Sequence, residues 1–524
     1  MEIFGVPHQA MMSQLLLGLV NGSFYAMLSL GLAVIFGLLN VINFSHGALY
    51  MMGAFLAWMG LSYFEINYWV MLAVAPLLVG AFGIVIERTM LRWLYKLDHL
   101  YGLLFTFGVT LVLEGVFRSF YGVSGQPYPV PDALQGATDL GFMVLPNYRA
   151  WVVAASLVVC LGTWFVIEKT KLGSYLRAGT ENPKLVEAFG INVPLMVTLT
   201  YGFGVALAGF AGVLAAPIIN VTPLMGSHLI IVVFAVVVIG GMGSIMGSII
   251  TGLGLGVIEG LTRVFYPPGS EVVVFVVMVI VLLLRLLPTC SAKKSRSPDM
   301  NNKNIGYAIA LALALAAPYF GYPVFLMKLL CFGLFACAFN LLIGFTGLLS
   351  FGHAAFFGSA GYVAGYMLRD KGWPFEAALL AGVGASALIG LVMGAVAIRR
   401  QGIYFSMITL ALAQMVYFGA LRAVHRRRGW LARCAARQAA GHGRSRERSD
   451  HVLRGAGHRD CLSFALIVRT VHSPFGQVLK AIKENEPRAI SLGFDVDRYK
   501  LLAFVLSAAL AGLAWRHQDR GARF

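Results

Sequence analysis

The chain has 524 residues, of which 59% are hydrophobic and 12% are charged, and its formal net charge is +17. Because a soluble domain carries about 25% charged residues, this composition excludes an ordinary soluble protein. It predicts an all-α, polytopic transmembrane helical protein surrounded by membrane lipid. The net charge does not indicate nucleic-acid binding, since residues 421–460 alone hold eleven Arg against three acidic residues.

Membrane spans are predicted wherever about 20 apolar residues can cross a hydrocarbon core of about 30 Å. The run 229–262 is too long for one crossing, because at about 1.5 Å per residue it would extend ~51 Å; "GGMGSIMG" at 240–247 offers a break. In the first half, spans are predicted at 12–37, 41–64, 68–86, 100–121, 149–168, 192–216, 229–262 (as two helices) and 271–287. Apolar runs of the second half lie at 305–321, 324–345, 349–368, 375–398, 403–420, 461–470 and 499–514.

Basic residues orient these spans, because Lys and Arg are enriched in cytoplasmic loops. One cluster at 88–96 follows the third span, and another at 169–184 follows the fifth, whereas the loop 122–148 has neither Lys nor Arg. The N-terminus and this loop are therefore predicted outside, and both clusters in the cytoplasm. Placing the cluster at 293–296 inside as well requires an odd number of crossings, which supports dividing 229–262.

A polar segment separates two apolar halves. "TCSAKKSRSPDMNNKN" at 289–304 is charged and rich in turn formers, which is typical of a linker. The predicted domains are a first membrane unit at 1–288, a cytoplasmic linker at 289–304 and a second membrane unit at 305–514, followed by an anomalous tail at 515–524.

Two polar clusters interrupt apolar runs in a similar way. "NVINFSHGALYMMGAF" at 40–55 and "GLLSFGHAAFFGSAGY" at 347–362 share the pattern Phe-Ser/Gly-His-Gly/Ala. These polar groups either line a pathway near a broken helix or satisfy backbone groups freed by the break. We favour the second interpretation, and expect no metal because no second ligand lies three or four residues away. The candidates for a pathway or helix break are Asn43, Ser45, His46, Ser350, His353, Gly240, Gly241 and Gly243.

A second duplication involves charged residues on the predicted cytoplasmic side. "GSYLRAGTENPKLVEAFGINV" at 173–193 aligns without gaps with "GQVLKAIKENEPRAISLGFDV" at 476–496. Each copy predicts one short amphipathic helix followed by a Gly, and each places a basic and an acidic residue four positions apart, where they are expected to pair. Two copies indicate two equivalent docking surfaces for a two-fold partner. The matched candidates are Gly173, Arg177, Glu181, Asn182 and Gly190 in the first copy, and Gly476, Lys480, Glu484, Asn485 and Gly493 in the second.

These segments, with "GGMGS" at 240–244 and "QGIYFSMITLALAQMVYF" at 401–418, resemble the permeases of high-affinity branched-chain amino acid ABC importers. The first half resembles one membrane subunit and the second half its companion, as if the two were fused in tandem. The resemblance implies a multi-pass protein of the bacterial inner membrane. It also implies that the cytoplasmic copies dock on two ATP-binding cassette subunits and that a periplasmic substrate-binding protein delivers the substrate. No GxxxxGK[ST] phosphate loop is present, so we expect a transport component that is not an enzyme and carries no cofactor.

One stretch does not fit this pattern. Residues 422–460 hold eleven Arg and four His but no Lys, where the family has a polar segment followed by another span. With permitted codons, "HRRRGW" from His425 shifted by one base reads Thr-Gly-Gly-Glu-Asp-Gly, and "HVLRGAGHRD" from His451 reads Met-Tyr-Tyr-Val-Val-Leu-Ala-Ile-Val. The same shift in "WRHQD" of the tail gives Gly-Gly-Thr-Lys. We hypothesise that 422–460 and 515–524 are out-of-frame translation, through a sequencing error or gene decay.

Two alternative functions remain at this point. The same architecture carries urea, short amides or sugars in related permeases. A secondary transporter or channel built from repeats would differ in class, but it would need ionisable residues at the midplane, and the predicted spans hold few. A membrane enzyme is disfavoured because the sequence shows no clustered catalytic constellation.

Overall fold

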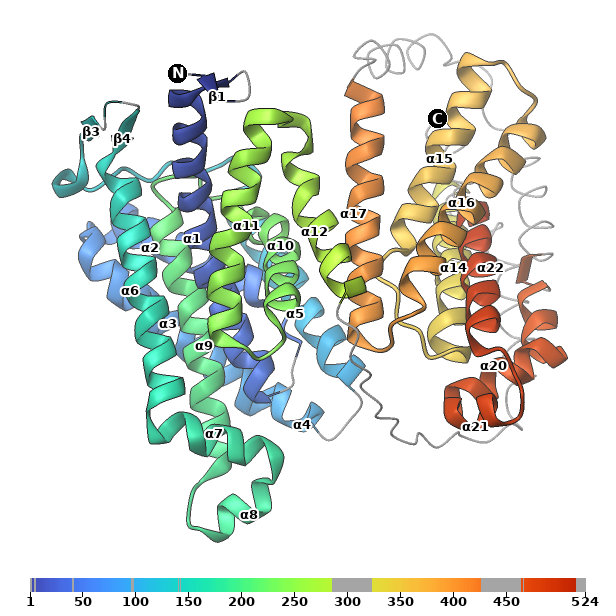
Figure 1. Cartoon of the computed structure of the whole chain (residues 1–524), viewed down its shortest axis with the longest axis horizontal. Coiled ribbons are helices and arrows are strands. Elements are labelled where there is room, and N and C mark those ends of the chain that lie inside the picture. Colours follow the sequence, from blue (N-terminus) through green and yellow to red (C-terminus); the bar gives the residue numbers. More distant parts are fainter. Residues whose placement is uncertain are drawn as a thin grey trace. The chain divides into compact units, whose positions relative to one another are not determined.

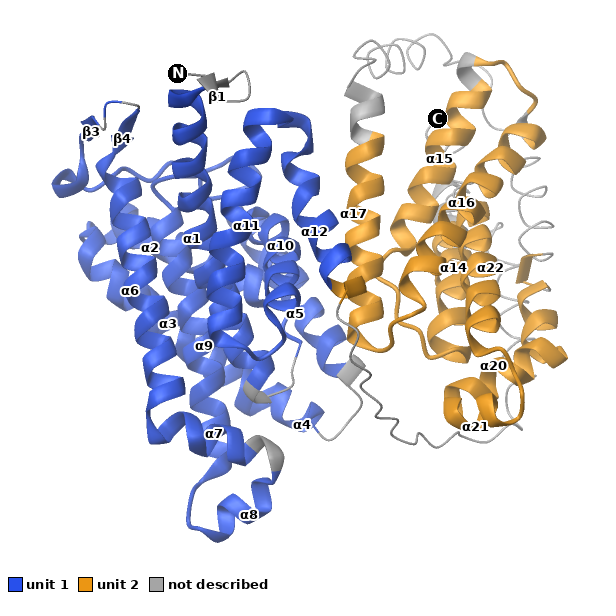
Figure 2. Cartoon of the chain, viewed as in Figure 1, with its two compact units in different colours: residues 1–281 blue, residues 282–524 orange. Residues whose placement is uncertain are grey.

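The computed structural model divides the chain into two compact units, Met1–Val281 and Leu282–Phe524, which are described separately below (Figure 2). It describes residues 6–39, 42–95, 99–139, 143–284, 323–425 and 466–514, together with the short pieces 2–3, 141 and 463–464. The predicted linker 289–304, the run 305–321, most of 422–460 and the tail 515–524 lie outside the described residues.

Unit 1 is a bundle of apolar helices (Figure 1). Short connections include the 3-10 turns η2 (Asp132–Leu134) and η3 (Pro267–Gly269), and the two-stranded pairs β1 (Glu2–Ile3) with β2 (Val6–Pro7) and β3 (Ala137–Asp139) with β4 (Val144–Pro146). Its long helices are α1 (His8–Leu39), α2 (His46–Phe64), α3 (Tyr68–Ile86), α5 (His99–Tyr121), α6 (Asn147–Lys169), α9 (Val193–Ala215), α10 (Met225–Gly240), α11 (Ile245–Phe265) and α12 (Ser270–Leu284). A π-helical turn, η1 (Glu87–Leu91), and the short α4 (Arg92–Leu94) continue α3.

The predicted break in 229–262 is confirmed. The chain leaves α10 at Gly240 and begins α11 at Ile245, and Gly241 and Gly243 between them have φ of +95° and +91°. Residues with a Cβ rarely adopt this region, so the glycines allow the turn. Ser244 then caps α11, because its Oγ accepts a hydrogen bond from the Gly247 N–H at 3.1 Å.

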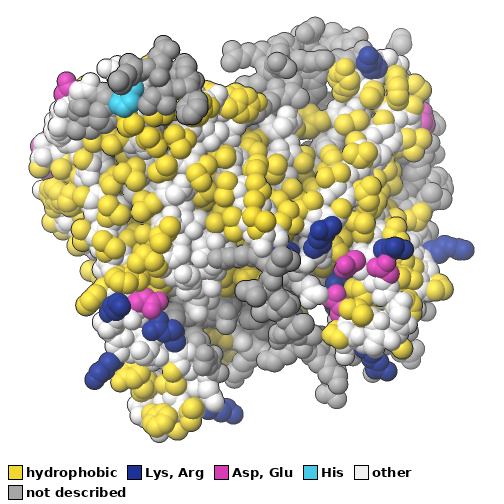
Figure 3. Space-filling model, in the orientation of Figure 1, with side chains coloured by type: hydrophobic (Ala, Val, Ile, Leu, Met, Phe, Trp, Pro, Cys, Tyr) yellow, Lys and Arg dark blue, Asp and Glu magenta, His cyan; other side chains and the backbone are white. Residues whose placement is uncertain are grey.

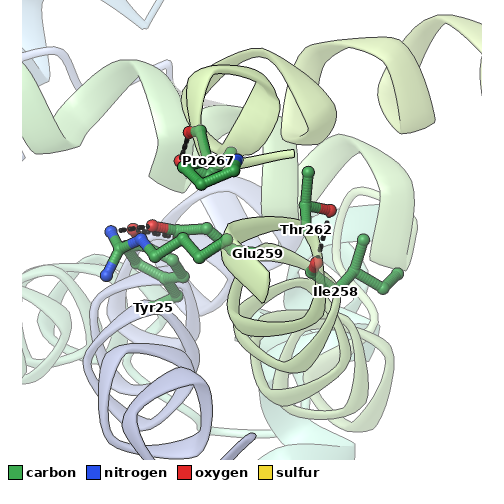
Figure 4. Close-up of polar contacts among 7 residues, drawn as sticks. Tyr25, Ile258, Glu259, Thr262 and Pro267 are labelled. Atoms are coloured by element: carbon green, nitrogen blue, oxygen red, sulfur yellow. Dashed lines mark hydrogen bonds and ion pairs between the residues drawn. The ribbon is translucent and has the colours of Figure 1, made fainter. Parts of the chain in front are cut away.

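Close packing of small residues joins α1 to α11. A Cβ built on Gly18 would lie 2.5 Å from the Gly256 carbonyl oxygen, and one on Gly252 would lie 2.5 Å from the Ala26 Cα. Lipid tails are as apolar as the helices, so van der Waals contact between backbones contributes much of the association energy. The Tyr25 hydroxyl also donates to Glu259 Oε2 at 2.9 Å across this interface (Figure 4).

The centre of unit 1 is formed by α1 and α9, each 72% buried over its most apolar stretch, whereas the corresponding stretch of α5 is only 22% buried. Most exposed side chains of α5 are apolar, among them Leu104, Phe107 and Val112. The face shown in Figure 3 is mostly hydrophobic over the middle of this unit, and its Lys and Arg gather at the end that carries α7 (Lys171–Glu181) and α8 (Pro183–Ala188). Such a surface fits a lipid surrounding.

Unit 2 repeats part of this arrangement. The helix α22 packs against α14, α15 and α16, and Phe504 on α22 contacts Phe356 and Phe405 with ring centroids 5.5 and 5.8 Å apart. Among all described residues, ten helices are long and apolar enough to cross a membrane. The described elements are α14 (Pro323–Phe345), α15 (His353–Asp370), α16 (Phe375–Ala397), α17 (Ile403–His425), α20 (Pro474–Glu484), α21 (Glu486–Ser491) and α22 (Val496–Ala514).

Candidate functional site

The predicted cytoplasmic segment of unit 1 consists of α7 (Lys171–Glu181) and α8 (Pro183–Ala188), which protrude beyond the long helices (Figure 1). The sequence predicted one helix, but Asn182 has an extended φ of −144° and starts a second one. Its Oδ1 accepts a hydrogen bond from the Leu185 N–H at 3.2 Å, which satisfies one of the donors that a helix start leaves free. Gly190, with φ of +83°, then turns the chain toward α9.

Unit 2 builds the same segment from α20 and α21. Asn485 has a φ of −156°, and its Oδ1 accepts a hydrogen bond from the Arg488 N–H at 3.1 Å. Gly493 has a φ of +85° and leads into α22. At the start of each segment, a side chain on Gly173 or Gly476 would collide with a backbone carbonyl of the preceding turn. Three aligned positions thus have the same local geometry in both units.

The structure tests one of the two ion pairs predicted within these helices. Arg177 pairs with Glu168 at the end of α6, at 3.1 Å, and the side chain of Glu181 lies outside the described residues. Lys480 lies over the ring of Phe345, 5.7 Å from its centroid, and no ion pair joins it to Glu484 in the part of the chain that the structure describes. In unit 2 the neighbouring helix α14 offers Lys480 its partner, and the spacing of four residues did not decide the pairing there.

Both segments are tied to the membrane helices. In unit 2, Lys500 on α22 is 3% exposed and pairs with Glu486 on α21 at 2.7 Å. Lys483 donates to the Gly344 carbonyl at the end of α14 at 2.8 Å, where a cation also complements the helix dipole. These contacts, with the pair between Arg177 and Glu168 in unit 1, join each segment to the long helices.

Each segment exposes an apolar side chain at the same position of its tip. Phe189 is 77% exposed and Leu492 is 66% exposed, and each directly precedes the Gly with positive φ. An exposed large apolar side chain that occurs at equivalent positions of both units marks a candidate contact site.

The polar turn before α2 is fully buried. Asn43 Oδ1 accepts hydrogen bonds from Ser45 Oγ at 2.5 Å and from the Ser45 N–H at 3.1 Å. His46 Nε2 donates to the Leu28 carbonyl of α1 at 3.0 Å. The helix begins at His46, within the predicted span 41–64, so the polar side chains lie at the helix start.

In unit 2 the corresponding turn makes its hydrogen bonds through serine hydroxyls. Ser350 Oγ accepts from the Gly352 N–H at 3.2 Å, which is the counterpart of the Asn43 bond. His353 Nε2 donates to Ser507 Oγ at 2.8 Å, and that hydroxyl donates to the Ala338 carbonyl at 2.5 Å. Ser507 aligns with Gly204 of unit 1. Gly204 has no side chain that could stand between the histidine and a carbonyl, and His46 bonds its carbonyl directly.

Three buried carboxylates in unit 1 escaped the sequence analysis, which expected few ionisable groups in the spans. Glu259 bonds Tyr25 and pairs with Arg263 at 2.5 Å (Figure 4). Glu114 accepts from Ser227, and Glu87 is 1% exposed. A single Glu inside or at the end of an apolar run is a visible signal, and each of these residues shows it.

Together, the duplicated segments and buried helix breaks on an apolar helical scaffold define a transport permease of the multi-pass type. The family described as "Branched-chain amino acid transport system / permease component" matches residues 14–282, 323–443 and 460–514. The chain belongs to this family of ABC permeases and is a transport component of the inner membrane.

Individual relatives agree with this placement. The high-affinity branched-chain amino acid permease BraD of Pseudomonas aeruginosa is 30% identical over 277 residues, which are 50% of this chain and 90% of BraD. LivM of Escherichia coli, with the same described function, is 29% identical over 282 residues, 47% of this chain and 65% of LivM. The fructose import permease FrcC of Rhizobium meliloti is 37% identical over 115 residues, 20% of this chain and 31% of FrcC. No solved structure matches the chain.

Proposed function

We propose that this chain supplies the membrane pathway of an ATP-driven importer of branched-chain or other hydrophobic amino acids. Two permease units, fused in tandem, together form the membrane part. Two ATP-binding cassette subunits dock on the cytoplasmic segments, and a periplasmic substrate-binding protein delivers the amino acid. Closure of the ATPase pair moves the segments, and the units change between inward-open and outward-open states as rigid bodies.

The observation that carries this proposal is the duplicated geometry of the two cytoplasmic segments. A solvated surface helix has no reason to keep the same capping Asn, the same turning Gly and the same exposed apolar tip in two units that are otherwise divergent. Two equal surfaces are what a two-fold symmetric pair of ATPases requires. The residues at these surfaces are Gly173, Arg177, Glu181, Asn182 and Gly190, and Gly476, Lys480, Glu484, Asn485 and Gly493.

Replacing both tips, Phe189→Glu with Leu492→Glu, is expected to abolish co-purification of the ATPase subunits. An apolar anchor at the centre of an interface is worth about 2 kcal/mol or more, so its loss weakens binding about 30-fold per site. Pull-down from detergent and ATP-dependent uptake into vesicles measure the effect. Phe64→Glu, 73% exposed at the opposite end of unit 1, is the control and should change neither. ATPase binding that survives the double change, or uptake that persists without ATP, contradicts the proposal.

The short match to a fructose permease supports a second substrate class. It covers one fifth of the chain, whereas the match to BraD covers half, so branched-chain amino acids are the preferred substrate. Uptake of labelled leucine and fructose, each with its own binding protein, separates the two.

We propose further that the buried histidines hold the helix breaks together and do not touch the substrate. His46→Ala is expected to destabilise the folded protein by about 2 kcal/mol, because a buried ring and its hydrogen bond are both lost. His46→Gln keeps a donor and should recover part of this stability. Thermal unfolding in detergent measures it, alongside uptake per folded molecule, which should stay unchanged. Normal stability with a raised KM for uptake would instead place His46 in the pathway.

A further inference from the structure

A buried polar contact lies where α3 gives way to the π-helical turn η1. Glu87, the first residue of this turn, is 1% exposed. Its Oε2 accepts a hydrogen bond from Thr198 Oγ1 at 2.7 Å, and its Oε1 accepts one from the Tyr95 hydroxyl at 3.2 Å. π-helical turns cost helix regularity and are frequent at functional sites.

Thr198 lies in the second turn of α9, the helix that follows the cytoplasmic segment directly. Asn192 caps this helix start, since its Oδ1 accepts from the Leu195 N–H at 3.1 Å. Tyr201, about one turn beyond Thr198, is fully buried, and its hydroxyl faces Ser45 and Asn43 of the polar turn. One short piece of helix thus connects the cytoplasmic segment both to Glu87 and to the helix break before α2.

Two groups at this junction lack a hydrogen-bond partner. In the part of the chain that the structure describes, neither the Tyr201 hydroxyl nor Asn43 Nδ2 has one, and both atoms are buried. Buried polar groups are normally paired, and leaving one unpaired costs free energy. A small shift of α9 that pairs these two groups would recover that free energy.

Unit 2 lacks this polar contact. The spacing that aligns His46 with His353 also aligns Glu87 with Gly394, and the spacing of the cytoplasmic repeat aligns Thr198 with Leu501 and Tyr201 with Phe504. The three counterparts are adjacent in space as well: a Cβ on Gly394 would lie 2.7 Å from Leu501 Cδ1 and 3.0 Å from Phe504 Cδ1. The same place in the fold is polar in one unit and apolar in the other.

We infer that Glu87, Thr198 and Tyr201 are positioning residues that transmit movement of α7 and α8 to the polar turn at 43–46, and that unit 1 alone uses this linkage. The hydrogen bonds that Glu87 accepts from Thr198 and Tyr95 are directional and, in an apolar surrounding, costly to break, so they tie α9 to the end of α3. Tyr201, buried on the same helix with its hydroxyl facing the turn at 43–46, passes a movement of α9 on to that turn by contact. Apolar contacts such as those in unit 2 can slide. Chains of packed side chains and hydrogen bonds can carry coupling between distant sites. The inference rests on the proposed docking of ATPase subunits on the cytoplasmic segments.

The test is the number of ATP molecules hydrolysed per amino acid imported. It is measured in proteoliposomes that hold the ATPase subunits, the binding protein and the chain with its reading frame restored across 422–460 and 515–524, which is the wild type for this comparison. Thr198→Val, which removes only the hydroxyl, is expected to raise this ratio at least about fivefold, the lower end of typical coupling between sites. Co-purification of the ATPase should stay normal. Glu87→Gln, of nearly equal volume, should act in the same direction, and Thr198→Ser, which restores a hydroxyl, should return the ratio to that of the wild type.

Two matched controls separate coupling from packing. Thr200→Val makes the same change on the same helix at a position 7% exposed that has no hydrogen bond to Glu87 among the described residues. Leu501→Val alters the counterpart of Thr198 in unit 2. Both should leave the ratio unchanged. An unchanged ratio in both Thr198→Val and Glu87→Gln, or an equal rise in the controls, overturns the inference. If the wild-type chain binds no ATPase, the proposed function fails instead.

Discussion

Replacing Gly256 with leucine is expected to prevent stable folding of unit 1. A side chain at this position would collide with the Cα of Gly22 and the carbonyl of Gly18, and a backbone cannot rotate away as a side chain does. Overpacking a well-packed core costs about 1–3 kcal/mol, and we expect a value at or above the upper end. The loss should appear as a lower unfolding midpoint in detergent and a reduced yield of monodisperse protein.

Gly254→Leu is the matched control, because it makes the same change two residues away on the same helix. A Cβ on Gly254 meets nothing within 4 Å. Replacing a helical Gly also removes conformational freedom from the unfolded chain, so this variant should be as stable as the wild type or slightly more stable. Equal destabilisation by both variants would show that helix propensity or membrane insertion decides the effect, and not the contact between α1 and α11.

Resequencing the gene across the codons for 415–465 and from 510 past the stop is expected to reveal single-base changes that restore one reading frame. Arg at the centre of a membrane helix costs about 2.5–3.5 kcal/mol on insertion scales, yet eleven Arg stand in 421–460, where the family resemblance calls for a span. The family match is also interrupted between 443 and 460.

Transport provides the second measurement of the same prediction. The frame-restored chain should import its substrate. The chain as given should import little or none, because its second unit would lack a span and its own counterpart of the break at Gly240–Ser244. A frame that stands as given in the DNA, together with normal uptake, would contradict the hypothesis and assign a function to the basic stretch.

The helical spans were predictable because apolar length is a local property. The runs 68–86 and 192–216 match α3 and α9 to within a residue or two at each end. The polar turns were harder: α2 and α15 begin at His46 and His353, later than the apolar runs indicate, since a buried turn can be as apolar in composition as the helix that follows it.

The partners of the candidate residues were not predictable. Arg177 pairs with Glu168 across two helices, and His353 reaches the Ala338 carbonyl only through Ser507. Such contacts depend on which helix faces meet, and a spacing of three or four residues carries no information on that. For the same reason, nothing in "TGLGLGVIEG" at 251–260 distinguishes Gly256, which lies against α1, from Gly254, which does not.

The sequence by itself determined the membrane class, the break between α10 and α11, and the duplicated segments of the two units, because each depends on composition or spacing along the chain. Only the tertiary structure decided that Glu87 meets Thr198, that Tyr201 faces the turn at 43–46, and that the same place in unit 2 is apolar. These groups are far apart in the chain, and packing of the helices against one another is what brings them together.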